Sequence, residues 1–268
     1  MDLQRRNNVQ VAGEGPATLV FSHGFGCDQT MWRHLVPVFS KRFRTVAYDL
    51  VGAGQSDEQA YDYTKYASLA GYAEDVNELI AAYGQGPVIY VGHSVSCMIG
   101  VLADRQVPGQ IAAHMMVGPS PCYINQGGYI GGFDPEDIQS LLETLESNYL
   151  GWASNMAPVI MGAPGEPAFG EELTNSFCQT NPDIARQFAR TTFLSDNRGD
   201  VEGLATPTLI LQSNQDLIAP ITVGEYLNRV MPNSTLTLID NVGHCPHLSA
   251  PSPCASAMTA FLAKWALG

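Results

Sequence analysis

The fold of this chain is decided by one short stretch, Val88-Ile89-Tyr90-Val91-Gly92-His93-Ser94-Val95-Ser96. An apolar run typical of a buried strand leads into Ser94, and a helix-like run begins directly after Ser96. A serine hydroxyl is a weak nucleophile unless a sharp strand-to-helix turn exposes it beside a base, and small flanking residues permit that turn. The usual pattern is G-x-S-x-G, and Ser96 occupies its last position, where what matters is bulk against the neighbouring strand. We predict a nucleophile elbow with Ser94 at its tip.

An acid and a base are found further along the chain, in the order that such an elbow requires. A buried strand is predicted over 208–212, and the loop after it contains Asp216. Another strand, over 236–239, leads into His244. We therefore predict that His244 is the general base that takes the Ser94 proton, and that Asp216 orients its imidazole.

A developing oxyanion also needs hydrogen-bond donors. The segment His23-Gly24-Phe25-Gly26 follows a predicted strand over 18–22, in the place where this fold supplies one backbone N–H. We predict that the N–H groups of Phe25 and Val95 form the oxyanion hole.

Each of these assignments has an ordinary structural alternative. Ser94 could be a helix N-cap, because serine favours that position. His244 could be a surface histidine. Asp240 also precedes His244, and it stays open as the acid in place of Asp216.

The other polar residues near these motifs are expected to be structural. His23 and His93 more often support loop geometry by hydrogen bonding than take part in chemistry. Cys245 and His247 flank the predicted base closely enough to suggest a metal pair, but further ligands at a sensible spacing are missing. The sequence therefore predicts no metal site.

Composition narrows the classes of partner and location. The 268 residues include 13 basic and 26 acidic ones, a formal net charge of −13, which argues against nucleic acid and anionic membranes as partners. The first eight residues lack the apolar run of a signal peptide, and no later run is long enough to span a bilayer. Six cysteines form no CxxC pair, which favours free thiols. We expect a cytoplasmic protein.

Strand-like and helix-like runs alternate up to about residue 118, the pattern of a parallel sheet with crossover helices in an α/β fold. Between 119 and 200 the rhythm changes to a helix-rich stretch without a convincing strand. We therefore predict a core over 1–118 and 201–268 and a helical cap over 119–200. Strands are predicted over 18–22, 44–49, 87–92 and 111–117, and helices over 72–83, from Asp134, over 184–193 and over 254–265.

The chain resembles a known group of α/β-hydrolases over nearly its whole length: the RsbQ-type bacterial hydrolases and their plant relatives, the karrikin and strigolactone receptors. The likeness to the RsbQ type is strongest through residues 118–123 and 245–247. It is carried by Gly24-Phe25-Gly26-Cys27-Asp28-Gln29, Asp49-Leu50-Val51-Gly52-Ala53-Gly54-Gln55-Ser56-Asp57, Gly118-Pro119-Ser120-Pro121-Cys122-Tyr123, Gly131-Gly132-Phe133, Asn148-Tyr149-Leu150-Gly151-Trp152 and Gly243-His244-Cys245-Pro246-His247-Leu248.

This resemblance implies a V-shaped lid of four helices that encloses an apolar cavity above Ser94, and it implies no cofactor. It also implies signalling beside a PAS-domain phosphatase as one possible setting. The residues predicted to line the cavity are Phe25, Tyr123, Phe133, Trp152, Met156 and Phe193, together with the loop residue Leu217.

Two functions of different class follow. The first is a serine hydrolase that cleaves small esters or lactones through an acyl-enzyme on Ser94. The second is a ligand sensor whose slow hydrolysis accompanies binding to a partner protein. C–C bond hydrolysis and perhydrolysis use the same triad, and the sequence does not separate them from ester hydrolysis.

Overall fold

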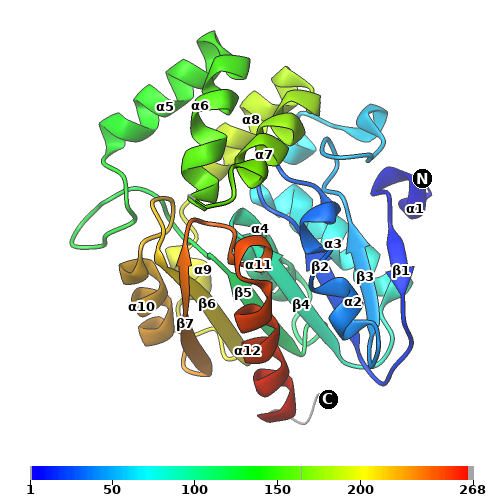
Figure 1. Ribbon diagram of the computed structural model, residues 1–268. Coiled ribbons are helices and arrows are strands. Elements are labelled where there is room, and N and C mark those ends of the chain that lie inside the picture. Colours follow the sequence, from blue (N-terminus) through cyan, green and yellow to red (C-terminus); the bar gives the residue numbers. More distant parts are fainter. Residues whose placement is uncertain (1, 164, 265–268) are drawn as a thin grey trace.

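The computed structural model describes residues 2–163 and 165–264. A seven-stranded sheet forms its centre, with the strand order β1-β3-β2-β4-β5-β6-β7 (Figure 1). All neighbouring strands are parallel except β1, which runs antiparallel to β3. The strands are β1 Gln10–Ala12, β2 Thr18–Ser22, β3 Arg44–Tyr48, β4 Val88–His93, β5 Ala113–Val117, β6 Thr208–Gln215 and β7 Ser234–Val242.

Helices cover both faces of this sheet, as continuous apolar strands require. In β4, Val88 and Tyr90 face the cluster that includes the central helices α3 and α4, whereas Ile89 and Val91 face the cluster that includes the C-terminal helix α12. Apart from the four helices α5 to α8, which are described below, the helices are α1 Leu3–Arg6, α2 Val36–Phe39, α3 Leu69–Tyr83, α4 Val95–Gln106, α9 Arg198–Val201, α10 Ile221–Val230, α11 Pro246–Ser249 and α12 Pro251–Lys264. Short 3-10 turns lie at Gln29–Trp32, Glu58–Ala60 and Lys65–Ala67.

The predicted α/β fold class is confirmed, and the predicted strands agree with β2 to β7 to within a few residues at each end. Two differences stand out. Strand β1 was not predicted, because its three residues are all exposed and show no apolar alternation. The predicted last helix corresponds to α12, and its predicted end at Trp265 lies outside the described residues.

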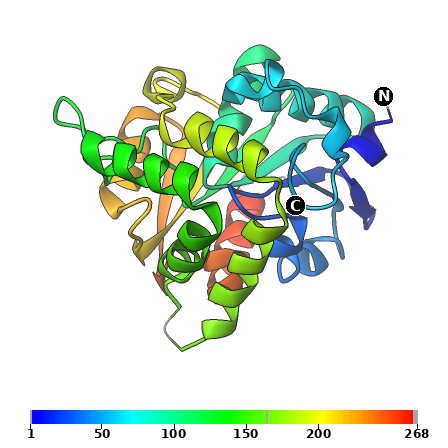
Figure 2. The same ribbon diagram turned by 90° about the horizontal axis from the view of Figure 1, so that it is seen from above.

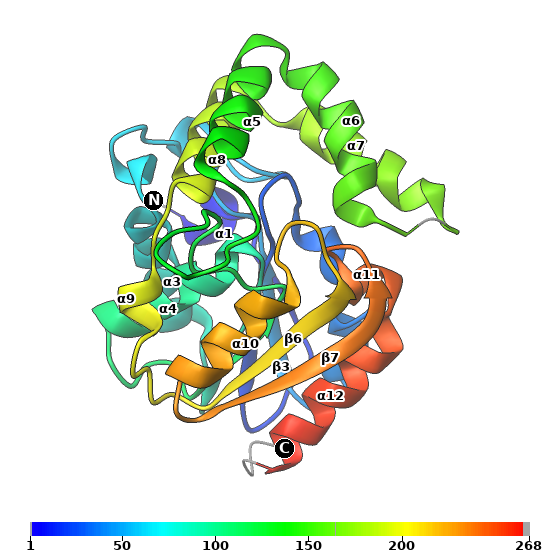
Figure 3. The same cartoon turned by 90° about the vertical axis from the view of Figure 1, so that its left-hand side faces the viewer.

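Of the described helices between β5 and β6 in the chain, the first four cross the carboxyl edge of the sheet (Figures 1 and 2). Helix α6 packs on α7 and α5 packs on α8, so that two pairs are splayed above the sheet (Figure 3). The division of the chain at residues 118 and 200 stays a prediction. These helices are α5 Pro135–Ser147, α6 Tyr149–Met161, α7 Pro167–Gln179 and α8 Pro182–Phe193.

Local sequence signals explain where the cap helices begin and end. Asp134 and Asp137 form a capping box at the start of α5, where Pro135 also lies in the first turn. The Asn148 side chain accepts a hydrogen bond from the Gly151 N–H at the start of α6. A third apolar cluster then joins all four helices to the loops at the carboxyl edge of the sheet.

Candidate active site

Ser94 lies at a strained turn between β4 and α4. Its φ of 55° and ψ of −126° place a non-glycine residue in a sparsely populated region, which costs about 1–3 kcal/mol. The turn is held by a hydrogen bond from the Ser94 N–H to the Val117 carbonyl, at 2.8 Å. Gly92 is required beside it, because a Cβ there would lie 2.9 Å from the Ser96 carbonyl oxygen. Ser94 occupies the N-cap position of α4, but its side chain makes no capping hydrogen bond, so capping does not account for the serine hydroxyl.

The Ser94 hydroxyl instead meets a buried histidine and carboxylate. His244 Nε2 is 2.8 Å from Ser94 Oγ, and His244 Nδ1 is 2.7 Å from Asp216 Oδ2. The other carboxylate oxygen, Asp216 Oδ1, accepts the N–H groups of Ile218 at 2.8 Å and Ala219 at 3.1 Å. The structure therefore brings the three predicted residues together in a geometry in which a proton can pass from Ser94 to His244.

Asp240, the alternative acid, lies elsewhere. Its side chain is exposed, and Oδ1 accepts a hydrogen bond from the Asn214 amide at 2.9 Å. Of the two candidate acids, Asp216 is therefore the one that lies beside His244.

The predicted oxyanion loop packs directly on the elbow. A Cβ at Gly24 would lie 2.7 Å from His93 Nδ1 and 3.1 Å from Ser94 Cβ, so only glycine permits this approach. His23 holds the loop: its Nε2 accepts the Leu50 N–H at 3.0 Å, which leaves Nδ1–H to donate to the Gly24 carbonyl at 2.9 Å. This is the structural role that was expected for His23.

The two predicted oxyanion donors lie next to the close approach of Gly24 to the elbow, since Phe25 follows Gly24 and Val95 follows Ser94. Val95 is the first residue of α4, whose N-terminal N–H groups and dipole favour a negative charge. The N–H groups of Phe25 and Val95 donate no hydrogen bond within the described part of the chain. Both are therefore free to bind a substrate oxygen.

Ser96 contributes more than the bulk expected of it from the sequence. Its buried hydroxyl donates to the carbonyl of His23 and accepts the Ser22 hydroxyl at 3.0 Å. Ser22 in turn accepts the Tyr48 hydroxyl at 2.8 Å. Serine at the last position of the elbow pattern therefore links α4 to the oxyanion loop by hydrogen bonds, which glycine would not do.

A group of aromatic side chains begins at the Ser94 hydroxyl. The Tyr123 hydroxyl is 3.5 Å from Ser94 Oγ, and burial raises the pKa of that phenol. The Phe25 ring lies 6.1 Å from those of Trp152 and Phe193. Four of the predicted pocket residues thus gather at one place, and Phe133 and Met156 are partly buried against the same cluster.

Two further rings that contact Phe25 were not predicted. Phe177 of α7 and Phe188 of α8 pack edge-on against Phe25, at 5.3 and 5.6 Å between ring centroids. The apolar spacing along α7 and α8 is the sequence signal that could have indicated them as inward-facing residues. Both side chains are buried in the structure.

The prediction that Leu217 lines the pocket is wrong. This side chain is 72 % exposed. The neighbouring Asp216 turns inward to accept the N–H groups of Ile218 and Ala219, and the tight loop that results directs Leu217 towards solvent.

Behind His244 lies a group of buried rings. The His93 ring centroid is 5.1 Å from that of His244 and 4.4 Å from that of His247, and the Trp32 ring lies 4.6 Å from His247 at a tilt of 35°. Burial lowers the pKa of His93 well below its usual range and lowers that of His247 to about 3. Burial also raises the pKa of the Cys245 thiol. Among residues 2–163 and 165–264, no group of His, Cys, Asp and Glu side chains is arranged to hold a metal ion.

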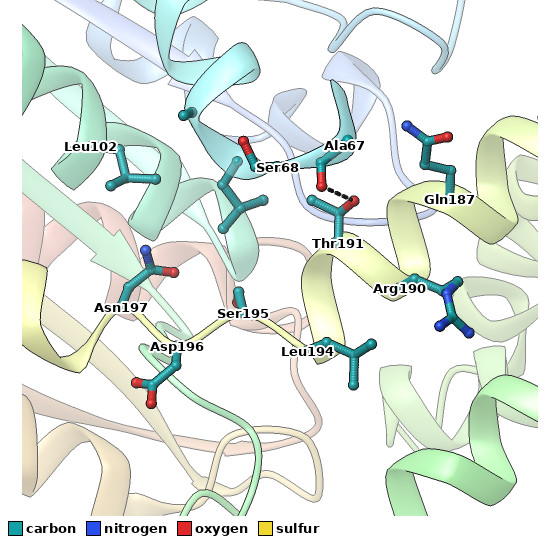
Figure 4. A pocket seen from close by; sticks show the side chains of 12 residues that line it. Ala67, Ser68, Leu102, Gln187, Arg190, Thr191, Leu194, Ser195, Asp196 and Asn197 are labelled. Carbon is teal, nitrogen blue, oxygen red and sulfur yellow. Dashed lines mark hydrogen bonds between the residues drawn. The ribbon is translucent and has the colours of Figure 1, made fainter. Parts of the chain in front are cut away.

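A separate pocket of about 700 Å³ opens at the joint between α8 and the start of α3 (Figure 4). Its charged side chains already have partners, since Arg190 pairs with Glu146 at 3.2 Å and Asp196 pairs with Arg198 at 2.5 Å. The residues that line this pocket include neither Ser94 nor His244.

The fold and the elbow define the class of protein: an α/β hydrolase with a serine at the nucleophile position. Comparison with known proteins gives the same answer. Residues 19–257 match the model of the alpha/beta hydrolase family, and the chain belongs to that family.

Named relatives agree with the predicted resemblance. A karrikin insensitive 2 receptor of Petunia hybrida is 37% identical over 250 residues, 93% of each chain. A strigolactone esterase of Arabidopsis thaliana is 36% identical over 92% of this chain and 93% of its own. The solved structure of a hydrolase from Oleispira antarctica is 40% identical, with a TM-score of 0.93 over 98% of this chain and 96% of that one.

Within the described ranges, no helix combines the length and apolar character needed to cross a bilayer.

Proposed function

We propose that this protein is a carboxylic ester hydrolase that cleaves small apolar esters or lactones through an acyl-enzyme on Ser94. The observation that supports this most directly is the continuous line of contacts from Asp216 through His244 to Ser94, at 2.7 and 2.8 Å. Ser94 Oγ would attack the substrate carbonyl carbon while His244 Nε2 takes its proton. The N–H groups of Phe25 and Val95 would bind the oxyanion.

Collapse of the tetrahedral intermediate would expel the alcohol, which takes its proton from His244, and leave an ester on Ser94. A water molecule that loses its proton to His244 would then release the acid and restore the serine. The aromatic rings of Phe25, Trp152 and Phe193 support an apolar acyl or alcohol group in the substrate. We also propose that the four cap helices act as a lid over this cluster.

The test is hydrolysis of p-nitrophenyl esters from acetate to octanoate, with Ser94→Ala as the control. We expect sustained turnover in the wild-type protein and at least a 1,000-fold loss in the variant, because removing one member of a triad abolishes covalent catalysis (about 10⁶-fold in subtilisin). Thermal unfolding of the variant checks that the fold is intact. Undiminished activity in Ser94→Ala would refute the assignment.

A second candidate is a ligand sensor, and it is favoured by the 37% identity to a karrikin insensitive 2 receptor. In this case hydrolysis would be slow and the output would be binding of a partner protein, such as a PAS-domain phosphatase, through the cap. A burst followed by stalling, with acylated Ser94 visible by mass spectrometry, would support the sensor. Many turnovers at a constant rate would support the esterase.

A cytoplasmic location is part of the proposal. All six cysteines carry free thiols, and five of them are buried. Unpaired cysteines in this number are typical of a reducing compartment.

A further inference from the structure

The main chain of His244 is bound from two sides. Its N–H donates to the carbonyl of Ile160, in cap helix α6, at 2.8 Å. Its carbonyl accepts a hydrogen bond from Nε2 of His93 at 3.1 Å. Neither contact involves the imidazole of His244, so the ring stays available for Ser94 and Asp216.

His93 is built to be a neutral donor. The carbonyl of His244 can only accept, so the His93 proton must be on Nε2. Its Nδ1 has no hydrogen-bond partner, and the backbone of Gly24 packs so closely that a Cβ there would lie 2.7 Å from this atom. His93 is 2 % exposed, and the titratable groups that face it are His23, His244, His247 and Cys245. A second positive charge at this place would oppose the imidazolium that forms on His244 during catalysis.

The chain directly before His244 also packs closely against the end of α6. Gly162 ends the helix in the left-handed region, with φ +60°, and Gly243 has φ +113°. A Cβ on Gly243 would lie 1.8 Å from the Met161 carbonyl oxygen. Backbone therefore packs against backbone at this point, and the end of α6 reaches the peptide before His244 directly.

We propose that His93 is a positioning residue. Together with the Ile160 carbonyl of α6, it holds the main chain of His244, so that Nε2 of His244 stays within reach of Ser94. This inference rests on the proposed ester hydrolysis. Because His93 is the residue directly before Ser94, the base is held by the segment that carries the nucleophile. A shift of the turn that carries Ser94 should therefore also shift the main chain of His244. The separation of 2.8 Å between Ser94 Oγ and His244 Nε2 is then preserved.

The test compares two buried imidazoles. His93→Phe removes the donor and keeps a ring, whereas His247→Phe makes the same change at a neighbour whose two nitrogens have no hydrogen-bond partner. Both variants should lose stability. We expect only His93→Phe to lower kcat for p-nitrophenyl acetate, by about 10- to 100-fold with KM changed less than twofold, because small misplacement of a catalytic group costs up to about 100-fold.

Rescue gives the second readout. His93→Gln restores an amide donor of similar reach and should recover kcat to within about fivefold of wild type, whereas His93→Asn is polar but too short and should not. This pair answers the question even where His93→Phe does not fold. Equal kcat losses in the His93→Phe and His247→Phe variants, or equal kcat in the Gln and Asn variants, would overturn the inference. Absence of Ser94-dependent turnover in the wild-type protein would instead refute the proposed function.

Discussion

Replacing Asp216 by asparagine tests the role of the carboxylate in the triad. The two oxygens of Asp216 have different partners: Oδ1 accepts two backbone N–H groups at 2.8 and 3.1 Å, and Oδ2 accepts His244 Nδ1 at 2.7 Å. An asparagine can supply only one acceptor. The two N–H groups hold its oxygen on their side, so its NH₂ group must face His244.

An NH₂ group in that position reverses the hydrogen bond. His244 Nδ1 must then accept, so the ring carries its proton on Nε2 and can no longer take one from Ser94. The wrong tautomer costs about 10⁴-fold in kcat in a serine protease triad. We expect a loss of about 10³- to 10⁴-fold in kcat/KM here, equivalent to about 4–5 kcal/mol of transition-state stabilisation.

The assay is hydrolysis of p-nitrophenyl acetate at pH 7.5, with thermal unfolding to check the fold. Asp240→Asn is the matched control, because that carboxylate is exposed and, within the described part of the chain, its hydrogen bond comes from the Asn214 side chain. It should keep nearly full activity. If the Asp216→Asn variant retained more than about a tenth of the wild-type activity, or if both variants lost activity equally, the assignment of the acid would be refuted.

Two further outcomes follow from buried contacts. Gly243→Ala should lower activity at least tenfold by driving the His244 loop away from Met161. The control is Gly203→Ala, at a glycine that also has a positive φ (+68°) but nothing within 4 Å, and it should cost only backbone strain of about 1 kcal/mol. Equal effects in assays of activity and urea unfolding would contradict this. The lowered pKa of His247, about 3, means that the folded protein resists a proton that the unfolded chain binds below about pH 6.5. Unfolding free energy should therefore fall between pH 6.5 and 3, by about 1.6 kcal/mol on going from pH 6.5 to 5 for this group. His247→Phe should show a shallower dependence in urea titrations, and an unchanged slope would be evidence against it.

The sequence was informative where chemistry depends on local pattern. Ser94, Asp216 and His244 each follow a strand with clear apolar character, and parallel strands end at the same edge of the sheet, so their meeting could be predicted. The position of Leu217 could not, because the direction of a loop side chain depends on the hydrogen bonds that Asp216 makes across the turn.

The links that hold His244 were hidden for a different reason. The carbonyl of Ile160 is a backbone group, and any residue at that position could provide it. His93 was read as structural, and the pattern around it did not show that its partner would be the carbonyl of His244. Such contacts depend on how the cap sits on the core, which local periodicity does not report.

The order of the segments in the chain also has a consequence for biosynthesis. Ser94 and its base His244 are separated by 150 residues, and the cap helices lie between them. At about 5–20 residues per second, a ribosome takes roughly 8–30 s to make that interval. During this time the nascent polypeptide carries a serine with no partner to activate it. Ser94 therefore becomes reactive only when β7 and the loop that carries His244 have been synthesised. A translation product that ends before this loop should not hydrolyse esters.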